Sequence, residues 1–475
     1  MDFFNYSVVE LAAMVREGDI SASELTEFAL KQINKLNPLL NCFVEINEEL
    51  AVAQAKQLDL LRSKGLQLGK LAGIPIGVKD LEDAKGFHTT KGSFLHANDG
   101  VKTTDSDLVK RLKAAGCVVI GKTNTPEFGY MPDTVNPLFG ATHNPWNLKK
   151  SPGGSSGGSG AAVASGMVPL ATGSDGGGSI RIPSALCGIP GVKPSLGRIP
   201  SGPAMPEWFD LSTKGVMARR LSDIAAVLDV VIGPEQSDLY SLPMPEPSWF
   251  AAVDMPSLPK VVAFSIDLGY GNLDDEIKEI TLKAVEKIAQ AGCEVIEVKL
   301  IDSDPVNYWL NLANCYNWRS IKPFYNSPLW EKVDPLLKAL LEQASRLSAQ
   351  DLLDAQAIGF TINQKLVEIF QKARVLLCPT IAGKWPDSGQ AGTINSVPDL
   401  NWVKFTYPFN MTRSPCAVVP IGFCKDKMPV SLQIVGPQHA DAAVIRAACA
   451  IEAVLNLQME KEIPSALTKE INFNQ

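Results

Sequence analysis

A stretch rich in glycine and serine, residues 151–187, constrains this chain more than any other part of its sequence. Its first ten residues, SPGGSSGGSG, are all glycine, serine or proline, and a second cluster, GGGS, follows at 176–179. Glycine has no side chain to bury and loses more backbone entropy on ordering than any other residue. We therefore expect the stretch to present backbone N–H groups and small hydroxyls to a ligand and not to fill a hydrophobic core.

The second cluster has the composition of an oxyanion hole. Gly176, Gly177, Gly178 and Ser179 place consecutive N–H groups beside a hydroxyl. Such N–H groups can converge on the point where negative charge develops when a carbonyl is attacked. The cluster therefore indicates chemistry at a carbonyl, with a serine next to the reacting atom.

Helical and strand patterns alternate along much of the chain. Residues 74–80 are an apolar run that ends in charge, which is typical of a strand buried on both faces. A helix followed by a strand is predicted at 105–116 with 117–120, at 160–169 with 170–171, and at 274–291 with 293–298. This alternation predicts an α/β fold in which helices cover both faces of a largely parallel sheet.

Helices are also predicted at the N-terminus and in the third quarter of the chain. Pro38 follows the second of the N-terminal helices, and the aromatic residues of the later region are expected to be mostly core. The remaining predicted elements are helices at 7–16, 21–36, 47–63 and within 307–372, a surface excursion at 234–257, strands at 375–377, 417–419 and 431–435, and a closing helix at 441–455.

Composition argues against several classes of function. The net charge is −7, and lysine and arginine are scattered, so a nucleic-acid surface is not supported. No run is long enough to span a membrane, and the N-terminus does not resemble a signal peptide. The nine cysteines show no CxxC spacing, and the histidines show no metal-ligand spacing. We predict a cytoplasmic protein with reduced thiols, no cofactor and no metal.

Two motif matches are interpreted as coincidental. Residues 116–123 fit the nucleotide-binding pattern GxxxxGK[ST], but their centre, CVVI, is strand material and not a loop that could wrap phosphates. Residues 153–157 and 154–158 fit GxSxG, yet KKSP precedes them where a nucleophile elbow requires a buried strand.

A serine nucleophile in this chain needs a base other than histidine. None of the four histidines, His88, His96, His143 and His439, lies in a stretch with catalytic character. Lys79 ends the apolar run 74–80, where burial would lower its pKa toward neutral pH and let it accept a proton. Asp80 follows it, but neighbouring side chains on a strand point to opposite faces, so we expect Asp80 to point away from the site.

The chain resembles the amidase signature family over residues 5–458. The resemblance is carried by LAGIPIGVKD at 71–80, GKTNTPEF at 121–128, NPWN at 144–147 and QIVG at 433–436, together with the glycine–serine stretch. It implies a single-domain α/β/α sandwich with a large central mixed sheet covered by helices on both faces. Within one domain of residues 1–475, it implies an N-terminal helical layer at 1–66, a signature core at 71–230 and a helical substrate-pocket insertion at 300–372.

The resemblance also assigns catalytic roles. It implies an amidase with a Ser–Ser–Lys triad in which Ser179 is the nucleophile, Ser155 the bridging serine and Lys79 the base. The N–H groups of residues 176–179 would form the oxyanion hole, and a cis peptide bond would precede Ser155. An inactive binding protein on the same scaffold is the alternative from another class, and it is disfavoured because all three triad residues are present.

The resemblance leaves two substrate classes open. The amidase subunit of the glutamyl-tRNA amidotransferase, which releases ammonia from glutamine, carries an aspartate two residues before a Phe-Thr pair, and Val403 occupies that position here. The segment SDGGGS at 174–179 is closer to stand-alone amidases such as the 6-aminohexanoate cyclic dimer hydrolases. We therefore favour hydrolysis of a small linear or cyclic amide, with the amidotransferase subunit as the alternative.

The remaining expectations concern the pocket and the partners. Cys315, within the segment NCYNW, is a candidate substrate-binding residue because polar and aromatic side chains surround it in the sequence. The expected partner is a small-molecule amide, with no nucleic acid and no membrane, and a homodimer is one possible assembly.

Overall fold

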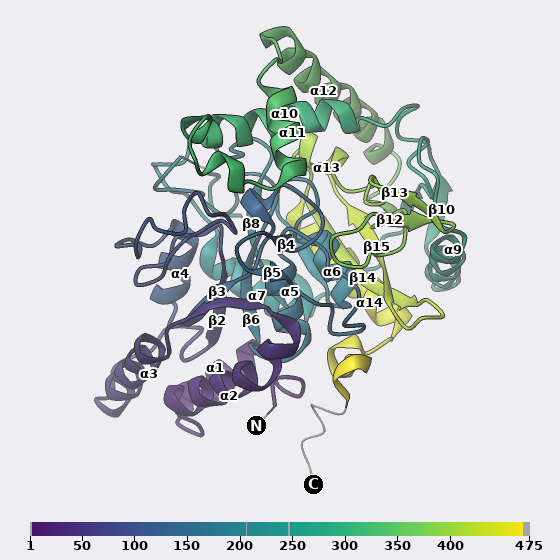
Figure 1. Ribbon diagram of the computed structural model, residues 1–475. Helices are drawn as coiled ribbons and strands as arrows, with labels where there is room; N and C mark the ends of the chain where they lie inside the picture. Colours follow the sequence, from purple (N-terminus) through teal and green to yellow (C-terminus); the bar gives the residue numbers. More distant parts are fainter. Residues whose placement is uncertain (1, 206, 246–247, 469–475) are drawn as a thin grey trace.

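The computed structural model describes residues 2–205, 207–245 and 248–468, and Figure 1 shows how its elements are arranged. The helices are α1 (Val8–Glu17), α2 (Ala22–Leu40), α3 (Glu48–Ser63), α4 (Asp107–Ala114), α5 (Gly157–Ala164), α6 (Arg181–Cys187), α7 (Leu221–Val231), α8 (Trp249–Asp254), α9 (Asp275–Gln290), α10 (Val306–Ile321), α11 (Pro335–Ala344), α12 (Ala349–Phe370), α13 (Pro408–Met411) and α14 (Asp441–Leu455). Short 3-10 helices include η1 (Glu127–Gly129).

The three N-terminal helices form as the sequence predicts, with one correction. Ser7 and Ser21 each close a capping box with the glutamate three residues later. Pro38 lies inside α2 and does not follow it, because the helix continues until Asn41 adopts a left-handed conformation and ends it. The extra turn buries Leu40 completely, and this burial offsets the cost of a proline within a helix.

The central sheet of the described residues has 11 strands in the order β1-β3-β2-β6-β8-β7-β14-β15-β11-β9-β10. They are β1 (Phe43–Ile46), β2 (Pro75–Lys79), β3 (Val118–Thr123), β6 (Leu170–Asp175), β7 (Gly191–Lys193), β8 (Thr213–Ala218), β9 (Val261–Phe264), β10 (Glu294–Glu297), β11 (Leu376–Pro379), β14 (Cys416–Phe423) and β15 (Pro429–Val435). Two small two-stranded sheets pair β4 (Val135–Asn136) with β5 (Gly140–Ala141) and β12 (Gly392–Ile394) with β13 (Val397–Asp399).

The sheet is mixed, so the expectation of a largely parallel sheet is wrong for its middle. The runs β3-β2-β6 and β11-β9-β10 are parallel, whereas the strands from β6 through β15 to β11 pair antiparallel. Helix–strand alternation holds only in the parallel runs. The middle of the sheet pairs antiparallel because a short turn joins β14 to β15 and because β7 and β8 lie there. The sequence pattern did not predict β7 and β8.

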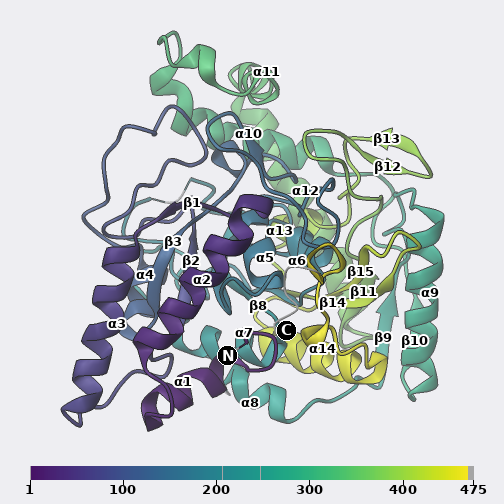
Figure 2. The ribbon, with the colours of Figure 1, turned by 60° about the horizontal axis from the view of Figure 1, so that its bottom comes forward.

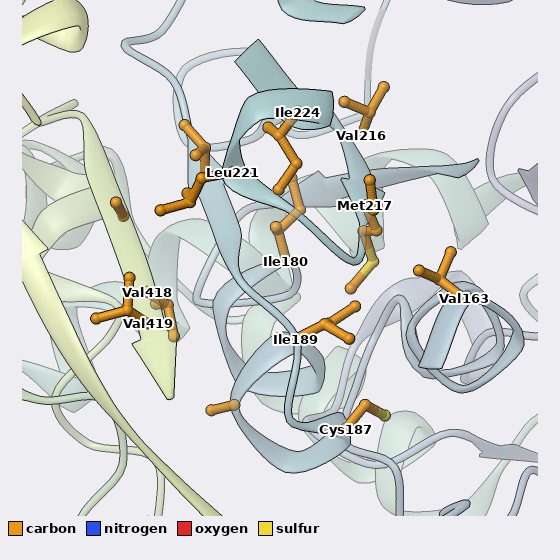
Figure 3. Packing of buried hydrophobic residues seen from close by; sticks show 14 of the residues in the cluster. Val163, Ile180, Cys187, Ile189, Val216, Met217, Leu221, Ile224, Val418 and Val419 are labelled. Atoms are coloured by element: carbon orange, nitrogen blue, oxygen red, sulfur yellow. The ribbon is translucent and has the colours of Figure 1, made fainter. Parts of the chain in front are cut away.

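Helices cover the sheet on both faces, as predicted. Helices α5 and α6 pack on one face of the central strands, and α7, α9 and α14 pack on the other (Figure 2). Figure 3 shows the alternation on β8, where Val216 and Met217 point to opposite sides. Met217 points into the space beside Val163 and Ile189, and these residues belong to a hydrophobic cluster that extends from Phe3 to Leu467.

Most of the glycine–serine stretch is buried, although its side chains were expected not to fill a core, and only Gly177 and Ser179 within it are partly exposed. Every residue from Ser151 to Ala164 is buried. The small residues of α5 let backbone pack on backbone: a Cβ added at Gly158 would lie 2.4 Å from the backbone nitrogen of Asn124. The stretch therefore serves the core by close approach of the main chain and not by side-chain volume.

The helices α10, α11 and α12 form a layer above one end of the sheet, which we call the cap (green in Figure 1). It matches the helical region predicted at 307–372. The rings of Trp318, Tyr325 and Trp330 in this region contact one another. Trp330 is buried in a small core of its own and Trp318 packs against it, but Tyr325 is exposed, so fewer of these aromatic residues are core than expected. Trp309 instead contacts Trp208 and Tyr407, next to the site described below.

Among the described residues, no single helix is long and apolar enough to cross a membrane, although the bent pair Asp441–Leu455 with Met459–Leu467 passes the same test of length and composition.

Candidate active site

Lys79 is the last residue of β2, and its side chain is completely buried. Its ammonium donates hydrogen bonds to three serine hydroxyls, at 2.8 Å to Ser155 Oγ, 2.9 Å to Ser156 Oγ and 3.0 Å to Ser174 Oγ. Of these three, the sequence predicts only Ser155 as a partner of Lys79. The sequence does not indicate Ser174 and Ser156, because their proximity to Lys79 depends on β6 lying beside β2 and on the turn before α5.

The environment of Lys79 favours a neutral amine near physiological pH. Burial is the largest cause and, with the charge of Lys214, lowers the pKa of Lys79 to about 7, while Glu82 and Asp175 oppose the shift. The three hydroxyls can accept from the ammonium or donate to the neutral amine, so the site accommodates both protonation states. Lys79 is therefore suited to accept and return a proton.

Asp80 points away from Lys79, as the strand geometry predicts. Its carboxylate pairs with Lys122 at 3.1 Å and accepts the hydroxyl of Thr90. Lys122 belongs to β3, so most of the segment that fits the nucleotide-binding pattern, residues 116–123, forms a strand. The lysine of that pattern is buried and takes part in the ion pair with Asp80.

Ser155 and Ser179 lie at the starts of the two helices on one face of the sheet. A cis peptide bond joins Gly154 to Ser155, as the resemblance implied. The N–H of Ser156 donates to the carbonyl oxygen of Ser179 at 3.2 Å, which ties the two turns together. Within the described residues no hydrogen bond links the Ser155 and Ser179 hydroxyls, but both residues line one cavity.

A buried ion pair holds the turn that carries Ser179. The Asp175 carboxylate contacts Arg181 at 2.8 Å, and both side chains are fully buried. The same carboxylate accepts the N–H groups of Gly178 at 2.8 Å and Ile180 at 3.2 Å. Although burial opposes ionisation, the Arg181 guanidinium holds the pKa of Asp175 well below its usual range. Residues 176–180 are thus wrapped around a fixed negative charge.

This arrangement narrows the predicted set of oxyanion donors. The N–H of Gly178 is engaged by Asp175 and does not face a ligand. The N–H groups of Gly176, Gly177 and Ser179 remain the candidate donors. Gly178 has φ of 125°, and an added Cβ would lie 2.5 Å from Thr406 Oγ1, so glycine is required there for both conformation and space.

Arg181 extends the network to distant parts of the chain. Its guanidinium donates to the carbonyl oxygen of Thr406 at 2.8 Å, to Gln433 Oε1 at 2.6 Å and to Asn410 Oδ1 at 2.6 Å. Asn410 in turn donates to the Asp175 carbonyl oxygen at 2.8 Å. The late segments 405–410 and 433–436 therefore act by fixing the turn that carries Ser179.

Two tryptophans pack against the glycine turn from above. Trp309 of α10 donates its Nε1–H to the Gly176 carbonyl oxygen at 2.9 Å, and a Cβ added at Gly177 would lie 2.3 Å from its ring. A Cβ added at Gly176 would lie 2.5 Å from the ring of Trp208. The glycines are needed for these close contacts, which nothing in the local sequence could indicate.

The cavity shared by Ser155 and Ser179, here the active-site cavity, has a volume of about 340 Å³. Trp208, Met205 and Phe128 give it apolar surface. Its charged lining includes Lys214, paired with Glu82, and Lys91, paired with Glu207. A cavity of this size, with apolar walls and a few convergent polar groups, suits a small molecule.

Cys315 is not brought to the active-site cavity in the described structure. It lies on α10 with Trp309, which faces the glycine turn, but a spacing of six residues places it on a different side of the helix. Burial and the nearby Asp351 carboxylate of α12 raise the pKa of its thiol. The described structure thus places Cys315 on α10, outside the residues that line the active-site cavity.

Glu127 connects the floor of the active-site cavity to the cap. It is fully buried in η1, beside Phe128 and Gly129, which line the cavity. Its carboxyl accepts the Ser93 hydroxyl at 2.5 Å and the backbone N–H of Asp334, which precedes α11, at 2.8 Å. Burial raises the pKa of Glu127 to about 7.

Among the described residues, no histidine lines the active-site cavity, and no group of three or more His, Cys, Asp or Glu side chains could hold a metal ion.

Comparisons with known proteins agree with this geometry. The family model Amidase matches residues 24–445. An acylamidase of Rhodococcus erythropolis is 36% identical, over 94% of this chain and 95% of its own length. The A subunit of glutamyl-tRNA(Gln) amidotransferase of Geobacillus kaustophilus is 32% identical, over 98% and 100%.

Solved structures agree as well. A bacterial aryl acylamidase of the amidase signature family superposes with a TM-score of 0.91 at 27% identity, over 97% of this chain and 98% of its own. The 6-aminohexanoate cyclic dimer hydrolase in complex with its substrate superposes with a TM-score of 0.88 at 28% identity, over 98% and 100%.

We predict that Arg181→Lys lowers both stability and activity. A lysine cannot reproduce the forked contacts with Asp175, Gln433 and Asn410, and the loss of good pairing in a buried ion pair costs about 3 kcal/mol or more. Thermal unfolding should shift down by several degrees, and kcat/KM should fall with it. The exposed Arg346→Lys is the control. An Arg181→Lys enzyme with the wild-type Tm would contradict the role assigned to this network.

We predict that Glu127 makes stability depend on pH. Its carboxyl titrates near 4.5 when unfolded and at about 7 when folded, so the folded state holds the additional proton between these values. Stability therefore falls as the pH rises through this window. Glu127→Gln should remove up to about 3 kcal/mol of that fall, measured by denaturant unfolding at pH 4.5 and pH 7.5.

The exposed cap carboxylate of Glu331 provides the matched control, and Glu331→Gln should leave the pH slope unchanged. Equal slopes in wild type and Glu127→Gln would show that the Glu127 carboxyl does not carry the proton.

Proposed function

The chain belongs to the amidase family, and from that premise we propose that it hydrolyses the C–N bond of a small linear or cyclic amide through an acyl-enzyme on Ser179. It is an amidase, a hydrolase of carbon–nitrogen bonds. The observation that carries the proposal is the buried Lys79, which bonds Ser155 at 2.8 Å at the edge of a cavity that also contains Ser179.

Acylation begins with attack of Ser179 Oγ on the amide carbonyl carbon. The Ser179 proton passes to Ser155 Oγ as the Ser155 proton passes to the neutral amine of Lys79. A pKa of about 7 leaves a large fraction of Lys79 neutral at physiological pH, whereas an ordinary lysine near 10.4 would be almost wholly charged. Burial thus supplies the base that a histidine supplies in other serine hydrolases.

The negative oxygen of the tetrahedral intermediate is stabilised by the N–H groups of Gly176, Gly177 and Ser179. They are preorganised because Asp175 and Arg181 hold the turn from below and Trp309 packs on it from above. Donors that need no rearrangement when charge develops stabilise a transition state more than flexible ones do.

Collapse of the intermediate breaks the C–N bond. The Lys79 ammonium returns its proton through Ser155 to the leaving nitrogen, and the amine departs while the acyl group stays on Ser179. Water then attacks the ester with Lys79 as base, and the second collapse releases the carboxylic acid and restores the Ser179 hydroxyl.

A largely uncharged amide suits the active-site cavity best. Each lysine that lines it is paired with a carboxylate, so the lining offers little net charge to an ionic substrate; the pairs are Lys91 with Glu207, Lys102 with Asp83 and Lys214 with Glu82. Trp208, Met205 and Phe128 suit an aromatic or aliphatic group. The names acylamidase and aryl acylamidase carried by similar proteins support this class.

Glutamine hydrolysis within an amidotransferase remains the alternative, because the A subunits of that enzyme are also similar in sequence. Against it stands Val403, which is buried and whose carbonyl oxygen accepts the Thr406 hydroxyl at 3.0 Å. The position offers no carboxylate to bind the amino group of glutamine.

The substrate proposal predicts activity of the purified chain alone. It should release nitroaniline from an acyl nitroanilide or acid from a small cyclic amide, and it should react covalently with a fluorophosphonate at Ser179. Ser179→Ala should abolish labelling and lower kcat by several orders of magnitude. Hydrolysis of glutamine only, and only with added subunits, would support the amidotransferase alternative instead.

The Lys79 proposal predicts a pH profile. Because the base must be neutral, kcat/KM should rise with pH to a plateau above about 7. Lys79→Arg should be inactive at every pH, because a guanidinium does not give up its proton, whereas the exposed Lys149→Arg should be unaffected.

Two further variants test whether Lys79 sets the profile. Lys214→Gln removes a positive charge that lowers the pKa of Lys79, so the rise should move to higher pH. Glu82→Gln removes a negative charge that raises it, so the rise should move to lower pH. If both variants keep the wild-type midpoint, a group other than Lys79 controls the profile.

A further inference from the structure

A second cavity, of about 740 Å³, shares no lining residue with the active-site cavity among the described residues. Arg198, Arg374, Arg446 and His439 line it, and no aspartate or glutamate among the described residues does. We call it the arginine cavity. Three guanidinium groups without a lining carboxylate are unusual in a chain whose net charge is −7.

Two of the arginines have no partner of their own. Among the described residues, the side chains of Arg374 and Arg446 form no hydrogen bond and no ion pair, and Arg446 Nε is buried without an acceptor. A buried N–H without an acceptor costs free energy, which a bound anion would recover. The arrangement therefore has unused capacity to donate to a ligand.

The third arginine is held in a fixed position. Arg198 Nε contacts Asp441 at 3.2 Å, and its other nitrogens donate to the carbonyl oxygens of Pro243 at 3.1 Å and His439 at 3.3 Å. Asp441 also accepts the Ser195 N–H at 2.7 Å, so its carboxylate is already committed within the fold. Its charge balances that of Arg198, and no carboxylate of the described residues forms an ion pair with Arg374 or Arg446.

The start of α14 adds to the positive potential. This helix begins at Asp441, its first turn has no side-chain cap, and Ala440, Ala442 and Ala443 line the cavity. The N-terminal end of a helix carries a partial positive charge and free N–H groups. The N-terminal end of α14 adds to the positive charge of the guanidinium groups, and the proposed site does not rest on this helix end alone.

Another part of the lining of the arginine cavity is apolar. Leu242, Met244 and Trp249 line it, and Trp249 is the first residue of α8, within the segment that sequence analysis treated only as a surface excursion. A ligand that fills the cavity would place an anionic group against the arginines and an apolar group against this apolar part.

We propose that the arginine cavity binds a small organic anion, a phosphate monoester or a carboxylate attached to an aromatic or aliphatic group. The guanidinium fork suits either oxyanion, since both offer two oxygens in one plane. The binding does not depend on amide hydrolysis, because the cavity lies apart from Ser179, Ser155 and Lys79.

Titration calorimetry of the full chain with phenyl phosphate and with benzoate, at low ionic strength, tests the proposal and distinguishes the two head groups. We expect saturable binding of at least one probe, weakened by added salt. The double variant Arg374→Gln with Arg446→Gln should weaken that binding about tenfold or more, because it removes two charge-assisted contacts.

The matched control is Arg346→Gln, which removes one positive charge from an exposed position elsewhere and should leave the affinity unchanged. The double variant should keep the wild-type Tm and amide hydrolysis, since neither arginine has a hydrogen-bond or ion-pair partner among the described residues to lose. Absence of saturable binding for both probes, or equal affinity in wild type and double variant, would overturn the proposal.

Discussion

The buried ion pair of Asp175 and Arg181 is the interaction on which the site depends. Two fully buried charges are costly to desolvate, and the cost is met only because nearly every oxygen and N–H of the pair has a partner. Those partners come from the glycine turn, from Asn410 and from Gln433, so segments more than 200 residues apart must be in place before the pair is satisfied. The turn that carries Ser179 is therefore fixed by the folding of the whole sheet.

Burial also determines the protonation state of Lys79, but here the buried group has no directly paired opposite charge, so burial favours the neutral form. Asp175 has a cationic partner and stays charged, whereas Lys79 is buried among neutral hydroxyls at 2.8 to 3.0 Å and is held near the point of losing its proton. The acid–base chemistry thus depends on withholding a direct ion pair from Lys79. Asp80, the residue next to it in sequence, pairs with Lys122 of β3, so this carboxylate does not pair with the amine of Lys79.

The sequence predicted the parts of this site that are local and missed those that are not. The strand that ends at Lys79, the direction of Asp80 and the glycine turn follow from period and composition within a few residues. The roles of Arg181, Asn410 and Gln433 could not be read in this way, because their partners are set by the antiparallel middle of the sheet, where β7 and β8 were not recognised. The placement of Cys315 shows a related limit: neighbours in a helical sequence do not share a direction, and Trp309, six residues earlier, is the residue that reaches the glycine turn, whereas Cys315 is not among the described residues that line the cavity.

The cap supports the sheet layer that carries the reacting groups, although none of the described residues that line the active-site cavity belongs to α10, α11 or α12. Lys79, Ser155 and the Asp175–Arg181 pair all belong to the sheet layer, where small residues and buried charges leave little freedom. The cap meets this layer through Trp309, whose indole N–H holds the Gly176 carbonyl oxygen, and through the Asp334 N–H on Glu127. A change of cap sequence that kept these two contacts would leave the reacting groups in place. The peptide plane between Gly176 and Gly177 is shared by both layers, because its carbonyl oxygen accepts the Trp309 N–H and its own N–H is a candidate oxyanion donor. Through this one peptide, packing in the cap can influence the rate of the reaction.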